Sequence, residues 1–83
     1  MAVNTVEPIT QAPAADVRLD REMLFVRLAD GREIGAPLTW FPRLQAATPE
    51  QRGNWRLIGR GLGIHWPDVD EDISVAGLLG LPD

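Results

Sequence analysis

The sequence predicts a small α+β domain, in which a small antiparallel sheet packs with two or three short helices. Two observations carry this prediction. Alternating apolar residues flank Asp30-Gly31, and this dipeptide between two strands is a strong hairpin signal. Thr48-Pro49-Glu50-Gln51 has the capping-box pattern with proline at the first helical position, which starts a helix. We expect the sheet to combine an N-terminal meander with a later hairpin.

Length and composition bound the organisation of the chain. Its 83 residues are enough for one small domain, and 45% hydrophobic with 24% charged residues is typical of a globular protein. The absence of cysteine excludes disulfide scaffolds, cysteine-ligated zinc and thiol chemistry. Residues 1–16 show no helical or strand period, so we expect a disordered N-terminal tail, a single α+β domain at 17–80 and a C-terminal tail at 81–83.

The meander is expected to begin with a short strand at 17–19 and a tight turn at Arg21-Glu22. In the next strand, 23–29, the residues Leu24, Val26 and Leu28 share one face, which predicts burial of that face. Asp30-Gly31 predicts a type I′ turn with positive φ at both residues. The return strand, 32–36, is expected to stop at Pro37, because proline cannot donate to a ladder.

Three short helices follow from capping signals. Thr39 is expected to cap a helix that carries Trp40, Phe41 and Leu44, with Pro42 in its first turn. The second helix starts after Thr48 and ends at Gly53 or Asn54. Ser74 is expected to cap a last helix, 75–79, which Gly80 closes.

The later hairpin is predicted between the second and third helices. A strand at 55–58 leads through a glycine-rich turn, 59–63, to a partner strand at 64–66, and Pro67 ends it. An acidic loop, 68–72, follows. About 65 ordered residues give a marginal core, so a homodimer or a complex with another chain would add stability.

Charge is unevenly distributed along the chain. Residues 17–60 hold all eight arginines against five acidic residues, whereas 61–83 hold five acidic residues and no basic one; the net charge is -4. A net-acidic chain without a basic run is a poor nucleic-acid binder on its own. Its acidic block suits a small basic protein partner instead. The apolar runs are too short for a membrane span, and Met1–Asn4 lacks the layout of a signal peptide, so we expect a cytoplasmic protein.

Two motifs lack residues that the corresponding binding sites require. The glycines at 59, 61 and 63 lack the spacing of a dinucleotide fingerprint and the Lys-Ser/Thr of a P-loop, so a turn or bulge explains them better. The acidic loop starts like a calcium loop, but Ile73 stands where glycine is needed and Leu79 where glutamate is needed. The sequence therefore predicts no cofactor and no metal site.

No complete catalytic set is visible, and the first hypothesis is a non-enzymatic module that binds a small protein. Its interface candidates are the acidic loop, the histidine next to it, and the aromatic and arginine residues of the types enriched in interface hot spots. These are Trp40, Arg43, Arg52, Trp55, His65, Trp66, Asp68, Asp70, Glu71 and Asp72. The alternative is a small metal-assisted hydrolase or nuclease subunit that uses His65 with Asp68, Asp70 or Asp72.

Several collinear blocks carry a family resemblance. They are Asp30-Gly31-Arg32, the run 37–44, the run 47–52, Asn54-Trp55, Ile58-Gly59, the run 63–67 and the run 70–75. Over 17–80 the chain resembles the bacterial family catalogued as domain of unknown function 2442. The resemblance implies a compact α+β module. Because members are often encoded beside a second small protein, domain of unknown function 4160, in pairs that look like toxin–antitoxin operons, it also implies an antitoxin-like or regulatory role toward that partner.

Overall fold

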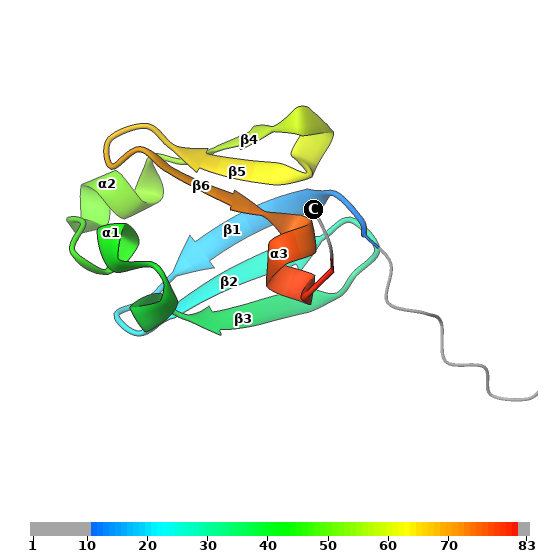
Figure 1. The fold of residues 1–83 in the computed structure, drawn as a ribbon, viewed down its shortest axis with the longest axis horizontal. Helices are drawn as coiled ribbons and strands as arrows, with labels where there is room; N and C mark the ends of the chain where they lie inside the picture. The colour runs from blue at the N-terminus through cyan, green and yellow to red at the C-terminus, as the bar shows by residue number, and fades with distance from the viewer. Residues whose placement is uncertain (1–10, 82–83) are drawn as a thin grey trace, which may run out of the picture.

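The first sheet follows from the alternation of apolar and polar residues near the N-terminus. In the computed structural model, which describes residues 11–81, strands β1 (Ala14–Leu19), β2 (Met23–Leu28) and β3 (Glu33–Pro37) form an antiparallel sheet in the order β1-β2-β3 (Figure 1). We call it sheet A. Leu24, Val26 and Leu28 are all buried, as their spacing predicts. The predicted meander is therefore confirmed.

Strand β1 starts at Ala14, three residues before the predicted start. A bulge interrupts its pairing with β2 between Ala14 and Asp16, and this extra residue lets both Ala14 and Val17 point into the core. Strict alternation backwards from Val17 would bury Ala15 instead, which is exposed. Because of the bulge, the buried residues at the start of β1 do not follow a period of two, so the sequence pattern does not indicate a strand there. The tail predicted at 1–16 is therefore wrong for 14–16. Residues 11–13 belong to no helix or strand, and 1–10 lie outside the described residues.

The β2–β3 connection differs from the predicted type I′ turn. Only Gly31 of the Asp30-Gly31 pair has a positive φ, at 95°. The Leu28 N–H donates to the Arg32 carbonyl at 2.7 Å, and the Gly31 N–H donates to the Leu28 carbonyl at 3.0 Å, so the loop spans four residues. The Asp30 carboxylate accepts from the Arg32 backbone N–H at 3.1 Å and holds this wider turn. The return strand consequently starts at Glu33 and includes Pro37 as its last residue.

The β1–β2 turn is built around one carboxylate. Asp20 Oδ1 accepts the backbone N–H groups of Glu22, at 2.8 Å, and Met23, at 2.7 Å. These two hydrogen bonds, the one from Glu22 first, hold the pKa of Asp20 below its ordinary value. Because the pKa is lower in the folded chain than in the unfolded one, the ionised carboxylate stabilises the fold above that ordinary value. The stabilisation is lost as the pH falls through the lowered pKa.

We therefore expect Asp20→Asn to flatten the acid limb of the stability curve. Asparagine still offers an oxygen to both N–H groups but carries no charge that acid could remove. Urea unfolding measured between about pH 5 and about pH 2 should show a smaller loss for the variant than for the parent. Glu22→Gln is the control, because it removes a neighbouring charge and leaves the Asp20 carboxylate that accepts both turn hydrogen bonds. Equal acid limbs for parent and Asp20→Asn would contradict the assignment.

The second sheet, sheet B, contains one strand more than predicted. Strands β4 (Arg56–Ile58), β5 (Gly63–Trp66) and β6 (Glu71–Ser74) pair antiparallel in the order β4-β5-β6. Glu71 and Asp72 were expected in a loop but belong to β6, because Ile73 pairs with Ile64 across the ladder and both are buried. The polar residues beside Ile73 face away from the core, and this alternation is that of a strand.

The short helices agree with most of the predicted caps. Helix α2 (Pro49–Gly53) has the full capping box, with Thr48 Oγ1 accepting from the Gln51 N–H at 3.1 Å. Helix α3 (Val75–Leu79) is capped by Ser74 and ends at Gly80, whose φ is 74°. Thr39 caps nothing, which corrects the prediction: it lies inside a 3₁₀ turn, η1 (Leu38–Trp40), and Phe41 is the N-cap of α1 (Pro42–Gln45). Pro42 ends the 3₁₀ turn early, since it has no N–H to continue it.

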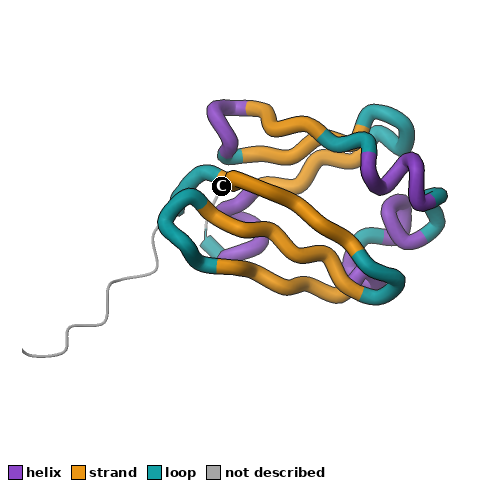
Figure 2. The backbone as a smooth tube through the Cα atoms, turned by 180° about the vertical axis from the view of Figure 1, so that it is seen from behind, coloured by secondary structure: helices purple, strands orange, loops and turns teal. Residues whose placement is uncertain are grey.

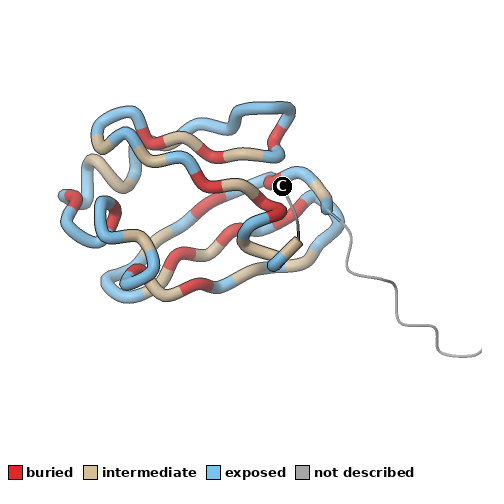
Figure 3. Tube along the Cα trace, in the orientation of Figure 1, coloured by how far each residue is buried: buried red, intermediate tan, exposed pale blue. Residues whose placement is uncertain are grey.

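The core lies between the two sheets and α3. Viewed from behind in Figure 2, sheet A stands in front with no helix across its outer face, whereas α3 lies against its inner face in Figure 1. Figure 3 shows buried residues on every strand except β4, which is exposed along its whole length. The predicted α+β class is confirmed, with two three-stranded sheets in place of one. Among the described residues, no helix is long and apolar enough to cross a membrane.

Candidate functional site

The four acidic residues after Pro67 form the β5–β6 hairpin and the start of β6. We call Asp68, Asp70, Glu71 and Asp72 the acidic hairpin. It is held to the helical end of the domain: Asn54 Nδ2 donates to Asp68 Oδ2 at 3.0 Å, and Arg43 Nη1 donates to the Asp70 carbonyl at 2.6 Å. Asp70 has a φ of 51°, which an aspartate tolerates better than most residues. The hairpin is therefore a fixed acidic surface and not a loose loop.

The sequence candidates His65 and Asp72 meet directly. They are cross-strand partners on β5 and β6, and His65 Nδ1 lies 2.5 Å from Asp72 Oδ1. The His65 side chain is 20% exposed and that of Asp72 is 65% exposed, so the carboxylate keeps one side open to solvent. Within the described part of the chain, no three His, Asp or Glu side chains gather where they could hold a metal ion. Asp68 and Asp70 are thus not brought into one ligand set with His65.

The three tryptophans have three different environments. Trp66 is fully buried, and its Nε1 donates to the Arg52 carbonyl at 3.0 Å. A side chain with no exposed surface cannot contact a partner, so Trp66 is removed from the predicted interface. Trp55 is half-buried against the core. Trp40 is 66% exposed, which is the highest exposure among the large hydrophobic residues that the structure describes.

Arg52 holds the helical end of the domain together. Its guanidinium donates from Nε to the Leu44 carbonyl at 2.9 Å and from Nη2 to the Gln45 carbonyl at 2.7 Å. These carbonyls end α1, where a helix leaves its last C=O groups without partners and favours a cation. Its Nη1 also donates to the Asp20 carbonyl, at 3.5 Å. Arg52 is one of the predicted interface residues, but its donors are used within the domain.

Trp40 and Asp72 line one groove, although they are 32 residues apart. The groove has a volume of about 360 Å³ and lies between η1, β6 and α3. We call it the Trp40 groove. Its lining residues are Trp40, Phe41, Asp72, Ile73, Ser74, Gly77 and Leu78. An exposed indole beside an exposed carboxylate and an apolar floor suits a side chain that has an apolar stem and a positive end.

Trp40 and Asp72 are both predicted interface residues, but the sequence does not show that they line the same groove. The other lining residues were missed as site residues, because nothing in the local pattern distinguishes a residue beside a groove from one on an ordinary surface. Ser74 is the N-cap of α3, and Gly77 and Leu78 lie within that helix, so α3 and its cap form one wall of the groove.

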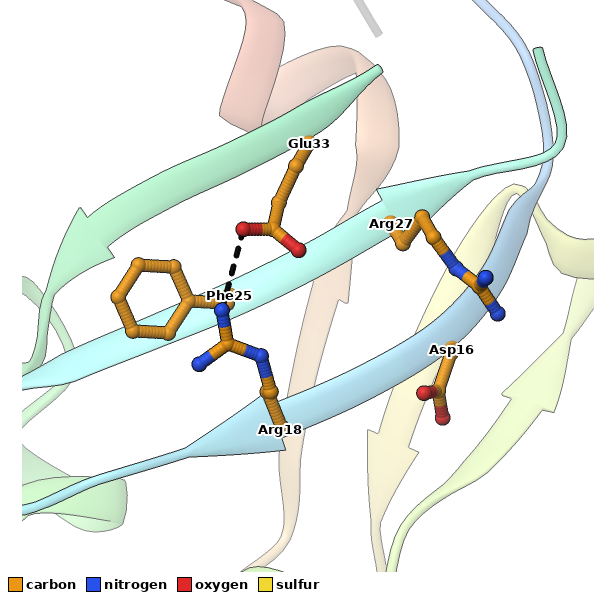
Figure 4. A pocket seen from close by; sticks show the side chains of 5 residues that line it. All are labelled: Asp16, Arg18, Phe25, Arg27 and Glu33. Carbon is orange, nitrogen blue, oxygen red and sulfur yellow. Dashed lines mark hydrogen bonds and ion pairs between the residues drawn. The ribbon is translucent and has the colours of Figure 1, made fainter. Parts of the chain in front are cut away.

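A second hollow lies on the outer face of sheet A. It has a volume of about 220 Å³ and is lined by Asp16, Arg18, Phe25, Arg27 and Glu33 (Figure 4). The Arg18 guanidinium lies 4.1 Å from the Phe25 ring centroid and pairs with Glu33 at 3.2 Å. Two arginines are matched by two acidic residues on this face. Its charge is balanced, and its aromatic ring is already covered, so it is a weaker site than the Trp40 groove.

Comparisons with known proteins agree with this architecture. The sequence model of the family described as "Protein of unknown function (DUF2442)" matches residues 14–81. Among solved structures, the chain is similar to a protein of unknown function from Rhodospirillum rubrum ATCC 11170, at 31% sequence identity and a TM-score of 0.73. The match covers 87% of this chain and 90% of that one. No curated protein matches the sequence.

Proposed function

The chain belongs to the DUF2442 family of proteins of unknown function, and from this premise we propose that it is a non-enzymatic module that binds a small basic protein. In its cellular setting this would be an antitoxin-like or regulatory role in the cytoplasm, toward a protein encoded beside it. The single observation that carries the proposal is the Trp40 groove, which is lined by both the exposed Trp40 and the exposed Asp72.

The chemistry of the groove supports a basic partner. Asp72 is 65% exposed, and the acidic hairpin continues the same sign of charge along β6 and its turn. Exposed tryptophan is among the residues that most often supply binding energy at interfaces. A lysine or arginine of the partner can place its charge at Asp72 while its stem lies on Trp40 and Phe41. The hairpin attracts the partner at long range, and the groove retains it.

Titration calorimetry with a small protein of the family catalogued as domain of unknown function 4160, the partner that the family resemblance implies, tests the proposal. We expect Trp40→Ala to weaken binding at least about tenfold, as for a hot-spot residue. Asp72→Asn should weaken it about two- to tenfold, and the difference should shrink at high salt because the ions screen the charge. Asparagine still offers an oxygen to His65 at this position, so the cross-strand contact survives.

Asp16→Asn is the matched control, because it removes one exposed negative charge on the outer face of sheet A. We expect it to bind like the parent. Equal affinity of the parent, Trp40→Ala and Asp72→Asn would overturn the groove as the binding site. The absence of binding by the parent chain would overturn the proposed partner.

A hydrolase or nuclease subunit is the second candidate, and the contact between His65 and Asp72 favours it. A carboxylate that holds one ring nitrogen of a histidine is the arrangement used for proton transfer in catalytic triads. This candidate predicts that the purified chain cleaves an ester or an oligonucleotide with a divalent cation present, and that His65→Gln abolishes cleavage. Binding without any cleavage would favour the first function.

A further inference from the structure

Strand β4 leaves one edge of sheet B open. It pairs with β5 and stands at the end of the order β4-β5-β6, and all three of its residues are exposed. Figure 3 shows this strand at the rim of the molecule, without a buried residue. Its pairing with β5 is continuous, and it contains no proline. A bulge and a proline, two of the devices that block an edge, are therefore missing here, and the strand is protected only by its short length and by Arg56.

Apolar side chains gather at this same edge. Among residues 11–81, the large hydrophobic residues with the greatest exposure, Trp40 apart, are Leu57 at 37%, Ile58 at 39% and Leu62 at 40%. Leu57 and Ile58 belong to β4, and Leu62 follows the 3₁₀ turn η2 (Gly59–Gly61) that leaves it. Such residues beside unpaired backbone groups are what an added strand needs: main-chain hydrogen bonds for affinity, and side-chain contacts for specificity.

The charges at the β4 edge favour an acidic partner. Arg56 and Arg60 flank the apolar pair, and no acidic side chain among residues 11–81 forms an ion pair with either of them. A second copy would bring two arginine-bearing edges together. The strand is also only about 10 Å long, too short to reach the roughly 800 Å² per partner that a stable interface buries. A short acidic segment meets both conditions.

We propose that the β4 edge binds an extended, acidic segment of a partner protein by strand addition. The segment alternates apolar and acidic residues, pairs its backbone with β4, and places its carboxylates against Arg56 and Arg60. This surface is separate from the Trp40 groove, because β5 lies between β4 and the β6 wall of that groove. The chain would then offer an acidic groove and a basic edge on opposite sides of one sheet.

The test uses a capped hexapeptide of alternating glutamate and valine, titrated into the full ¹⁵N-labelled chain. We expect amide shifts to concentrate at 55–62. A lysine–valine hexapeptide should bind at least tenfold more weakly, because its charge is reversed. Arg56→Glu combined with Arg60→Glu should weaken the glutamate peptide at least tenfold and reverse the preference. Arg21→Glu with Arg27→Glu is the control, since it changes the net charge equally on sheet A and its turn.

Backbone pairing is tested without changing the protein. Two further glutamate–valine hexapeptides carry N-methyl groups on alternate amides, one set for each edge of the extended peptide. We expect one of them to lose binding at least tenfold and the other to keep it, because only one edge of the peptide faces β4. Equal binding by both would overturn strand addition, as would shifts centred away from 55–62. Trp40→Ala should bind the hexapeptide like the parent, so failure here is distinct from failure of the groove.

Discussion

Replacing Trp66 with alanine is expected to leave the chain mostly unfolded at room temperature. Trp66 is the largest fully buried side chain of the described core, and it lies on β5 between β6 and the helical end. Removing a buried tryptophan costs about 3–5 kcal/mol. The change also leaves the Arg52 carbonyl without its indole donor, at about 1–3 kcal/mol. A core of this size supplies only about 3–5 kcal/mol of stability, and the combined loss of about 4–8 kcal/mol matches or exceeds it.

Urea unfolding followed by far-ultraviolet circular dichroism measures this effect. Trp66→Phe should lie between the parent and the alanine variant, because it keeps an aromatic ring and loses the donor. Trp40→Ala is the matched control: its side chain is 66% exposed, and we expect a change within about 0.5 kcal/mol. If Trp66→Ala unfolded cooperatively within about 1 kcal/mol of the parent, the position of this side chain in the core would be wrong.

Gly61→Ala is expected to have the second largest effect, about 2–5 kcal/mol. Gly61 has a φ of 85°, and a residue with a Cβ pays about 1–2 kcal/mol in this left-handed region. Its added Cβ would also lie 2.8 Å from Pro13 Cβ and 3.2 Å from the Ala14 carbonyl oxygen. Forcing the start of β1 away from the turn costs about 1–3 kcal/mol more.

Gly59→Ala separates the two causes. Gly59 also has a positive φ, at 57°, but a Cβ there would meet nothing within 4 Å. We expect it to lose only the conformational part, about 1–2 kcal/mol. Hydrogen exchange adds a local readout, because the Ala29 N–H donates to the Pro13 carbonyl at 2.8 Å and should exchange faster in Gly61→Ala alone. Equal losses for the two variants would show that β1 does not press against the turn.

The open edge and the groove differ in how far the sequence could predict them. The strand at 55–58 was predicted from its β-forming residues, and the glycines after it predicted a turn. The strand β4 stands at an edge because β6 pairs with the other side of β5. The sequence predicts a loop in place of β6, because Glu71 and Asp72 are acidic. Local composition favours a loop for such residues, but pairing of Ile73 with Ile64 outweighs it.

The sequence by itself determined the local structure of this protein: the alternation in β2, the capping box at Thr48, the Ser74 cap, and the family to which the chain belongs. These features depend on residues within a few positions of one another. Tertiary structure alone decided that Trp66 is buried while Trp40 is exposed, and that Arg52 serves the end of α1. It also decided that Trp40 and Asp72 line the same groove. Burial and such contacts depend on residues that are far apart in the chain. In addition, elements of three to five residues are too short for a periodic pattern to show which side faces the core.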